Sequence, residues 1–147
     1  MAAVVSSGRP LFAQRDSDEI DDITGKYHFI SADDTLAILE EDGKLKGYVD
    51  VAQGDEESDA VLSYQIVDGL RKKTHVRFRT GEIHRKYYRF SGAVERGSGH
   101  EPTDPDYLRL IGDLEIVTFK GDSRDESVQR MRVIFKSIGQ SERPDEE

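Results

Sequence analysis

The chain has 147 residues, a length that fits a single domain. It contains no cysteine, which excludes disulfides, thiolate catalysis and zinc sites built on cysteine. There are 30 acidic against 21 basic residues, a formal charge of −9, and no apolar run long enough for a membrane-spanning helix. The first residues lack the basic start and apolar core of a signal peptide, so we expect a cytoplasmic protein.

Both ends of the chain have the composition of tails. Residues 1–20 combine small and polar side chains with the start of an acidic cluster, and residues 140–147 are mostly charged and include a proline. Segments of this kind at chain termini are ordered only when something holds them in place. We therefore predict a disordered acidic leader over 1–20, a β-barrel domain over 21–139 and a disordered acidic tail over 140–147.

Between these ends, apolar residues recur at every second position, which places alternate side chains on one face of a strand. No proline lies between residues 11 and 101, as continuous hydrogen-bonded strands require. The pattern predicts an antiparallel meander of about eight strands. The runs that carry it are Tyr27–Ser31, Leu36–Ile38, Leu45–Val51, Leu62–Ile66, Thr74–Phe78, Tyr88–Val94, Leu108–Ile116 and Met131–Phe135.

Turn residues predict how the first strands pair. Asp42-Gly43 as a two-residue loop pairs Glu41 with Lys44 and places the flanking apolar residues on one shared face. For the second hairpin we predict a three-residue loop, Val67-Asp68-Gly69, with the glycine left-handed. The third connection, over residues 80–84, brings the apolar faces of its two strands together.

Residues 124–138 fit two kinds of structure. The stretch from Ser123 to Glu126 has the pattern of a helix capping box, and Gly139 would stop an amphipathic helix. The β-branched pair Val133-Ile134 beside Phe135 favours a strand instead. The sequence is compatible with either a helix or a strand over residues 124–138.

Neighbouring strands joined by short turns, without crossover helices, form either a closed up-and-down barrel or a two-sheet sandwich. Gly47, Gly92 and Gly112 occupy inward positions of long strands and suggest the bends that barrel closure needs. We predict an all-β fold, a single antiparallel up-and-down β-barrel of about eight strands. The alternatives are a two-sheet β-sandwich, or seven strands plus a C-terminal helix.

The opening Gly25-Lys26-Tyr27, the tight Asp42-Gly43 hairpin and a last strand placed to meet the first resemble the lipocalin-like, or calycin, barrels across roughly residues 23–138. The Gly-x-Tyr start departs from the Gly-x-Trp of lipocalins, and the chain contains no tryptophan. The resemblance is one of architecture and carries over no functional residue. It implies a barrel whose interior accepts an apolar or amphipathic small ligand.

The predicted interior contains the candidate ligand-binding residues. In the predicted register a lysine shares the apolar face with six aromatic side chains, and it either reaches the barrel mouth or binds an acidic group of a ligand. The set is Tyr27, Phe29, Tyr64, Lys72, Phe78, Tyr88 and Phe90.

One segment of the acidic chain is strongly basic. From residue 71 to residue 89 there are eight Lys/Arg and one acid, so this segment carries +7 and the rest of the chain −16. One face of its strands gathers the residues that we call the basic stripe: Arg71, Lys73, His75, Arg77, Arg79, Arg85, Tyr87 and Arg89.

The predicted registers place Arg79 opposite Arg85 and His75 opposite Arg89, and like charges in such positions are destabilising. The repulsion requires compensation. Carboxylates of adjoining strands, such as Glu95, Asp113 and Glu115, would provide it, and so would an external anion, to which arginine binds in bidentate fashion.

Three functions follow from these observations. The first is a non-enzymatic barrel that binds a small apolar or acidic ligand in its interior or mouth. The second is an interaction module that docks an acidic protein partner, or a second copy of the chain, on the basic stripe. The third is a barrel enzyme of isomerase or cyclase type, for which the sequence identifies no catalytic residue.

No cofactor or metal is expected. The four histidines lack the spacing of metal ligands, and the acidic loop 54–59 lacks the alternation of a calcium-binding loop. Nucleic acid is disfavoured as a partner because the −16 outside the basic segment repels a phosphate backbone.

Overall fold

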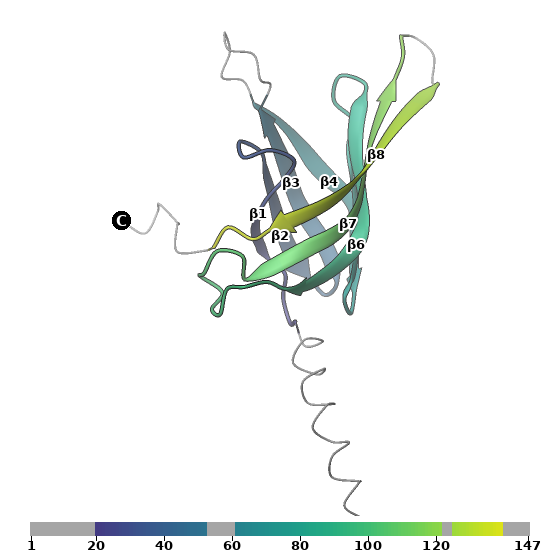
Figure 1. Cartoon of the computed structure of the whole chain (residues 1–147). Coiled ribbons are helices and arrows are strands. Elements are labelled where there is room, and N and C mark those ends of the chain that lie inside the picture. Colours follow the sequence, from purple (N-terminus) through teal and green to yellow (C-terminus); the bar gives the residue numbers. More distant parts are fainter. Residues whose placement is uncertain (1–19, 53–60, 122–124, 140–147) are drawn as a thin grey trace, which may run out of the picture.

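The structure, a computed structural model, describes residues 20–52, 61–121 and 125–139 (Figure 1). The predicted leader and tail lie outside the described residues, except for Ile20, which is buried in the core. The acidic loop 54–59 also lies outside them. Within the described ranges, no helix is long and apolar enough to cross a membrane.

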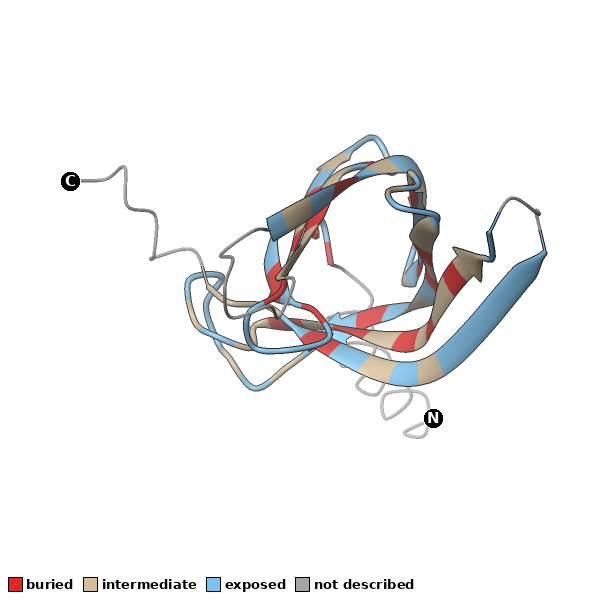
Figure 2. Ribbon diagram, turned by 90° about the horizontal axis from the view of Figure 1, so that it is seen from above, coloured by how far each residue is buried: buried red, intermediate tan, exposed pale blue. Residues whose placement is uncertain are grey.

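Eight antiparallel strands form one sheet in chain order, and the sheet curls on itself (Figures 1 and 2). An isolated bridge between Tyr27 and Ser137 joins the end of the last strand to the first. The predicted all-β up-and-down barrel is confirmed, and the segment that the sequence left open is a strand. The strands are β1 (Gly25–His28), β2 (Thr35–Glu41), β3 (Lys44–Ala52), β4 (Val61–Lys72), β5 (His75–Thr80), β6 (Lys86–Arg96), β7 (Leu108–Phe119) and β8 (Glu126–Lys136).

The first hairpin, between β2 and β3, has the two-residue Asp42-Gly43 loop that the sequence predicts. Asp42 and Gly43 have φ of 55° and 80°, the left-handed conformation that a two-residue hairpin loop requires. Glu41 pairs with Lys44, as predicted. Leu36 and Val49 also pair and are fully buried, so the two strands share one core face.

The second hairpin differs from the prediction. β4 continues through Asp68 and Gly69, and the chain turns at Lys73-Thr74 instead. Gly69 serves close packing, because a Cβ added there would lie 2.7 Å from the Cβ of Leu45 on β3. The Asp-Gly pair therefore marks a close approach of two strands, and the predicted three-residue loop was wrong.

A bulge in β4 reverses which of its side chains face the interior. Ile66 pairs with Thr80 whereas Asp68 pairs with Arg79, so Val67 is an extra residue in β4. Beyond it, Arg71 pairs with the buried Val76 and points inward. Lys72 is exposed on the outer face, and its predicted inward orientation was wrong.

The predicted pairing of β5 with β6 also needs correction. Arg79 lies opposite Arg89, and His75 lies opposite Ala93. Arg85 pairs with neither strand, because it lies in a tight turn before β6 begins. The apolar faces nevertheless coincide as predicted, with Phe78 opposite Phe90.

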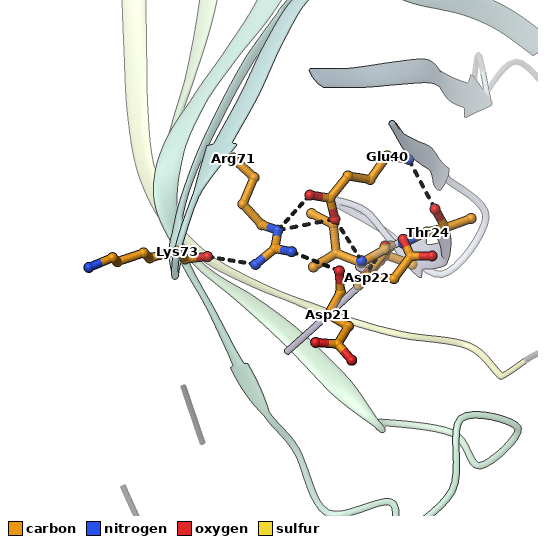
Figure 3. A network of polar contacts seen from close by, with 8 residues as sticks. Asp21, Asp22, Thr24, Glu40, Arg71 and Lys73 are labelled. Carbon is orange, nitrogen blue, oxygen red and sulfur yellow. Dashed lines mark hydrogen bonds and ion pairs between the residues drawn. The ribbon is translucent and has the colours of Figure 1, made fainter. Parts of the chain in front are cut away.

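The inward Arg71 binds several groups at the end of the barrel where β1 begins (Figure 3). Its Nε donates to both carboxylate oxygens of Glu40 on β2, at 2.9 and 3.1 Å, and the two side chains are only 10% and 8% exposed. Its two terminal nitrogens donate to the backbone carbonyls of Lys73, at 2.7 Å, and Asp21, at 3.0 Å. Arg71 thus ties β2, β4 and the segment before β1 together.

β6 and β7 approach each other closely at a glycine pair. Gly92 lies opposite Gly112, and a Cβ added at Gly92 would lie 2.2 Å from the carbonyl oxygen of Ile111. Since that oxygen belongs to the backbone, the contact cannot be relieved by a side-chain rotation. The two strands can therefore adopt this curvature only with glycine at the crossing.

We expect Gly92→Ala to lower the free energy of unfolding by about 2 kcal/mol or more, because the new methyl group meets backbone atoms. Urea unfolding followed by far-ultraviolet circular dichroism measures the change. Gly81→Ala is the matched control, since its nearest heavy atom, in Val67, would lie 3.5 Å away, an ordinary contact. Equal unfolding midpoints for the two variants would contradict the role assigned to Gly92.

We expect Arg71→Met to destabilise the fold by about 3 kcal/mol, because it leaves the nearly buried Glu40 carboxylate without its cation. Lys72→Met at the neighbouring exposed position should leave the free energy of unfolding almost unchanged. Chemical denaturation of both variants under one buffer condition provides the measurement. A larger loss from Lys72→Met would contradict the bulge and the orientation of β4.

Candidate functional site

The six aromatic residues predicted to face the interior all do so. Together with Phe135 on β8 they are at most 5% exposed. Phe29 contacts Tyr88 edge-on at 5.3 Å between ring centroids and Phe135 at 4.9 Å. Rings from opposite walls therefore pack against one another across the barrel. Space for a ligand must be sought at the ends of the barrel and on its outer face.

A pocket of about 380 Å³ lies at the end of the barrel where β4 begins, opposite the end that holds Arg71. Its walls combine apolar and aromatic side chains with a hydroxyl and a cluster of basic residues. They are Leu62, Tyr64, His84, Arg85, Lys86, Thr118 and Phe119, and we call this pocket the mouth. Of these residues, the sequence singled out only Tyr64 for the interior and Arg85 for the stripe.

The basic side of the mouth is built by a tight turn. His84 and Arg85 have φ of 54° and 63°, and the flanking Ile83 and Lys86 bond to each other through both backbone pairs, at 2.9 and 3.1 Å. The amide of Phe119 on β7 donates to the carbonyl of Arg85 at 3.0 Å and fixes the turn against the barrel. The sequence indicates a turn here but not that its basic side chains line a pocket.

Two phenols lie in contact below the mouth. Tyr64 and Tyr88 meet edge-on at 5.0 Å between ring centroids. Burial raises the pKa of both hydroxyls, and the nearby Tyr64 and Asp34 raise the pKa of Tyr88 further. Both phenols therefore keep their protons at neutral pH, so Tyr64, which lines the mouth, is a neutral hydrogen-bonding group.

Asp34 belongs to the same end of the barrel. It is 5% exposed, and its carboxylate accepts hydrogen bonds from the amides of Ala52, at 3.0 Å, and Ser31, at 3.3 Å. It thereby ties the connection between β1 and β2 to the end of β3. Its role in this arrangement is to hold the rim in place.

A second hollow lies on the outer face of strands β4 to β8. It measures about 400 Å³, and we call it the outer groove. The residues that line it are Asp68, Arg77, Phe78, Arg79, Arg89, Phe90, Ser91, Asp113, Glu115 and Arg130. Glu115 lies between two arginines, with Arg89 and Arg130 each at 2.6 Å. Hydrogen bonds from Arg130 and Arg89 hold the pKa of Glu115 below its usual value.

The basic stripe is shorter than predicted. Arg71 faces inward, Arg85 lies at the mouth, and Lys73 lies in the turn between β4 and β5. The members that remain together on the outer face are His75, Arg77, Arg79, Tyr87 and Arg89.

Compensation by carboxylates of the adjoining strand is confirmed for Arg89, which pairs with Glu115. Arg77 and Arg79 differ, because both are exposed and neither forms an ion pair with any residue in the described ranges. The outer groove therefore combines satisfied ion pairs with two available guanidinium groups.

A third hollow, of about 440 Å³, lies between the segment before β1 and the connection from β6 to β7. Its walls carry both signs of charge, from Asp21 and Asp22 and from Lys26 and Arg96. The connection itself is ordered by Asp106, whose carboxylate accepts from Arg109 at 2.7 Å. This hydrogen bond is the main reason why the pKa of Asp106 lies well below its ordinary value.

No protein-family model and no curated protein matches the sequence. Solved structures do match the fold. One described as a rhizavidin–biotin complex gives a TM-score of 0.58 at 12% identity, over 78% of this chain and 99% of that chain. Apo shwanavidin gives a TM-score of 0.55 at 16% identity, over 80% of this chain and 98% of the shwanavidin chain.

Intact afifavidin in its apo form gives a TM-score of 0.57 at 14% identity, over 88% of this chain and 92% of its own. All three are avidin-like proteins, whose fold is a calycin-type barrel of eight antiparallel strands. At these identities the likeness concerns the fold alone. The calycin resemblance indicated by the sequence is thereby confirmed as a resemblance of architecture.

Proposed function

We propose that the protein binds a small molecule with an apolar body and an anionic group, such as a carboxylate, in the mouth of the barrel. The observation that carries this proposal is the composition of the mouth. Within about 380 Å³ it combines the apolar and aromatic Leu62, Tyr64 and Phe119 with the basic Arg85 and Lys86. Binding pockets for small molecules have this size and this mixture of apolar walls and few polar groups.

The packed interior limits how deep such a ligand can sit. The rings of Tyr64 and Tyr88 are each at most 2% exposed and form the floor beneath the mouth. The apolar body of a ligand would rest against Tyr64 and Leu62, while its anionic group would face the basic turn. The guanidinium group of arginine suits this role because it binds a carboxylate through two parallel hydrogen bonds.

Two of the similar structures are described as complexes with biotin. Biotin has a methylene chain and a thioether ring that are apolar, a polar ureido group, and a carboxylate, so it carries both the apolar part and the anionic group that the mouth favours. It is therefore the first defined compound to test on this chain, beside anilinonaphthalene sulfonate, a fluorescent apolar anion of unrelated chemistry.

We expect saturable binding of at least one of these two probes, measured by calorimetry for biotin and by fluorescence for the dye. Arg85→Asn should weaken that binding about tenfold through loss of a charge-assisted hydrogen bond. Asparagine tolerates the left-handed backbone at this position, where φ is 63°, so the turn is retained.

Arg77→Asn is the matched control, since Arg77 lies on the outer face and lines a different hollow. No saturation by either probe up to about 1 mM, or an equal loss in both variants, would contradict binding at the mouth. Unchanged unfolding midpoints distinguish lost binding from lost structure.

A second candidate function rests on the outer groove. The exposed guanidinium groups of Arg77 and Arg79, without ion pairs to described residues, favour the docking of an acidic protein segment there. The paired Arg89–Glu115–Arg130 row would form one wall of that surface. Such contacts between exposed charges are long-ranged at low salt and screened at high salt.

We expect a fluorescent glutamate-rich peptide to bind the protein at about 20 mM salt and to dissociate at about 300 mM, as measured by fluorescence anisotropy. Arg77→Glu combined with Arg79→Glu should abolish this binding. Lys44→Glu combined with Lys46→Glu on β3 makes the same change in net charge elsewhere. If both double variants lose binding equally, only the overall charge acts and the docking surface is contradicted.

A further inference from the structure

The outer face of β6, β7 and β8 carries its side chains in four rows that cross the three strands (Figure 1). Paired residues of neighbouring strands direct their side chains to the same face of the sheet, so the strand register defines each row. The two inner rows are charged or polar, and the row on either side of them is apolar. Starting from the mouth, the rows are Tyr87 with Val117 and Val128, then Arg89 with Glu115 and Arg130, then Ser91 with Asp113 and Arg132, and last Ala93 with Ile111 and Ile134.

Both apolar rows reach the solvent at β8, where Val128 is 46% and Ile134 is 52% exposed. Along β7 the two rows are six residues apart, at Val117 and Ile111, which is about 20 Å in an extended strand. Exposed apolar side chains therefore flank the charged surface on two sides and offer contact area to a partner.

β5 adds two arginines to the middle of this surface. Arg79 lies opposite Arg89, and Arg77 lies opposite Ser91, so four neighbouring outer positions carry three guanidinium groups and a hydroxyl. All four residues line the outer groove. Arg89 is held by Glu115, whereas Arg77 and Arg79 have no ionic partner among the residues that the structure describes.

The local charge of this surface is positive although the chain is acidic. Four arginines and three carboxylates line the outer groove, and a fifth arginine, Arg132, binds the groove residue Asp113 at 3.3 Å. These five arginines and three carboxylates leave a charge of +2, in a chain whose formal charge is −9. A phosphate monoester carries about −1.5 to −2 at neutral pH and so matches the surface more closely than a single carboxylate does.

We propose that the segment bound by the outer groove is a phosphorylated one, with its phosphate held by Arg77, Arg79 and the hydroxyl of Ser91. This inference rests on the second candidate function, the docking of an acidic protein segment, and specifies the chemistry of that segment. A carboxylate is matched by one guanidinium fork, whereas the three terminal oxygens of a phosphate accept from two forks and a hydroxyl together.

The apolar rows define which residues surround the phosphate. The middle of the charged rows lies about 10 Å from either apolar row, half of their separation along β7. An extended segment in the polyproline II conformation rises about 3.1 Å per residue and directs every third side chain to the same side. A segment lying along β6 and β7, in either direction, would thus place apolar residues three positions before and three positions after the phosphorylated residue.

The charge of the rest of the chain disfavours other carriers of phosphate. Outside residues 71–89 the chain carries −16, which repels a nucleic acid backbone or an anionic membrane surface. A short protein segment with one phosphate presents its negative charge only to the groove. The partner that fits is therefore a phosphorylated protein segment with apolar residues on both sides of the phosphate.

Three short fluorescent peptides test this chemistry by anisotropy at about 20 mM salt. The first has a central phosphoserine with a leucine three positions to either side, the second has glutamate in place of phosphoserine, and the third has serine in place of both leucines. We expect the first peptide to bind about tenfold more tightly than the second and about threefold more tightly than the third. The glutamate-rich peptide of the second candidate function is measured beside them.

A charge-preserving variant tests the arginine forks. Arg77→Lys with Arg79→Lys keeps both charges but removes the planar forks, and it should lower the preference for phosphoserine over glutamate to about twofold. Lys44→Gln with Lys46→Gln, at two exposed positions of β3, removes two charges elsewhere and should leave the preference unchanged. The opposite result for the two variants would overturn the proposal, because the total charge alone would then explain the preference.

The outcomes separate this inference from the function on which it rests. If neither the phosphoserine nor the glutamate-rich peptide binds, the docking surface itself is contradicted. If the glutamate-rich peptide binds and the first two short peptides bind equally, the docking surface stands and the phosphate inference is overturned. Displacement of the first peptide by inorganic phosphate as effectively as by the unlabelled peptide would overturn the role given to the apolar rows.

Discussion

The packing of aromatic rings across the barrel is the constraint on which the rest of this structure depends. Period-two alternation brings the rings of Phe29, Tyr64, Tyr88, Phe90 and Phe135 to the interior, where neighbouring centroids are 4.9–5.4 Å apart. These rings stabilise the sheet, and they also occupy the volume that a deeply bound ligand would need. The hollows that could hold a ligand therefore lie at the ends of the barrel and on its outer surface, where the charged residues are.

The single extra residue in β4 decides how those charges are distributed. Alternation alone predicts that most of the basic residues of residues 71–89, Lys72 and Lys86 excepted, share one outer stripe. The bulge at Val67 instead turns Arg71 inward, where Glu40 and two backbone carbonyls satisfy it. The tight turn before β6 moves Arg85 to the mouth. Residues 71–89 thus contribute basic side chains to three places: the buried ion pair with Glu40, the mouth and the outer groove.

The sequence could predict those residues of the candidate site whose orientation follows from the alternation of side chains along one strand. Tyr64 was identifiable as an inward residue from its alternation with Leu62 and Ile66, and it lines the mouth. Phe119 and Lys86 join the mouth only because the end of β7 and the start of β6 meet there, which no local pattern encodes. The Asp68-Gly69 pair was misleading, since the same residues that favour turns also permit the close contact between Gly69 and Leu45.

The sequence by itself predicted the all-β class, seven of the eight strands, the Asp42-Gly43 hairpin and the inward aromatic face, because these depend on alternation and turn chemistry within a few residues. Only the tertiary structure decided that residues 126–136 form a strand, and only it decided the bulge in β4, the inward position of Arg71, the assembly of the mouth and the contact of β1 with the end of β8. Each of these depends on contacts between strands far apart in the chain, such as the closing bridge from Tyr27 to Ser137. A bulge or a contact between the first and last strands is a relation between two strands, so the pattern of one strand does not contain it.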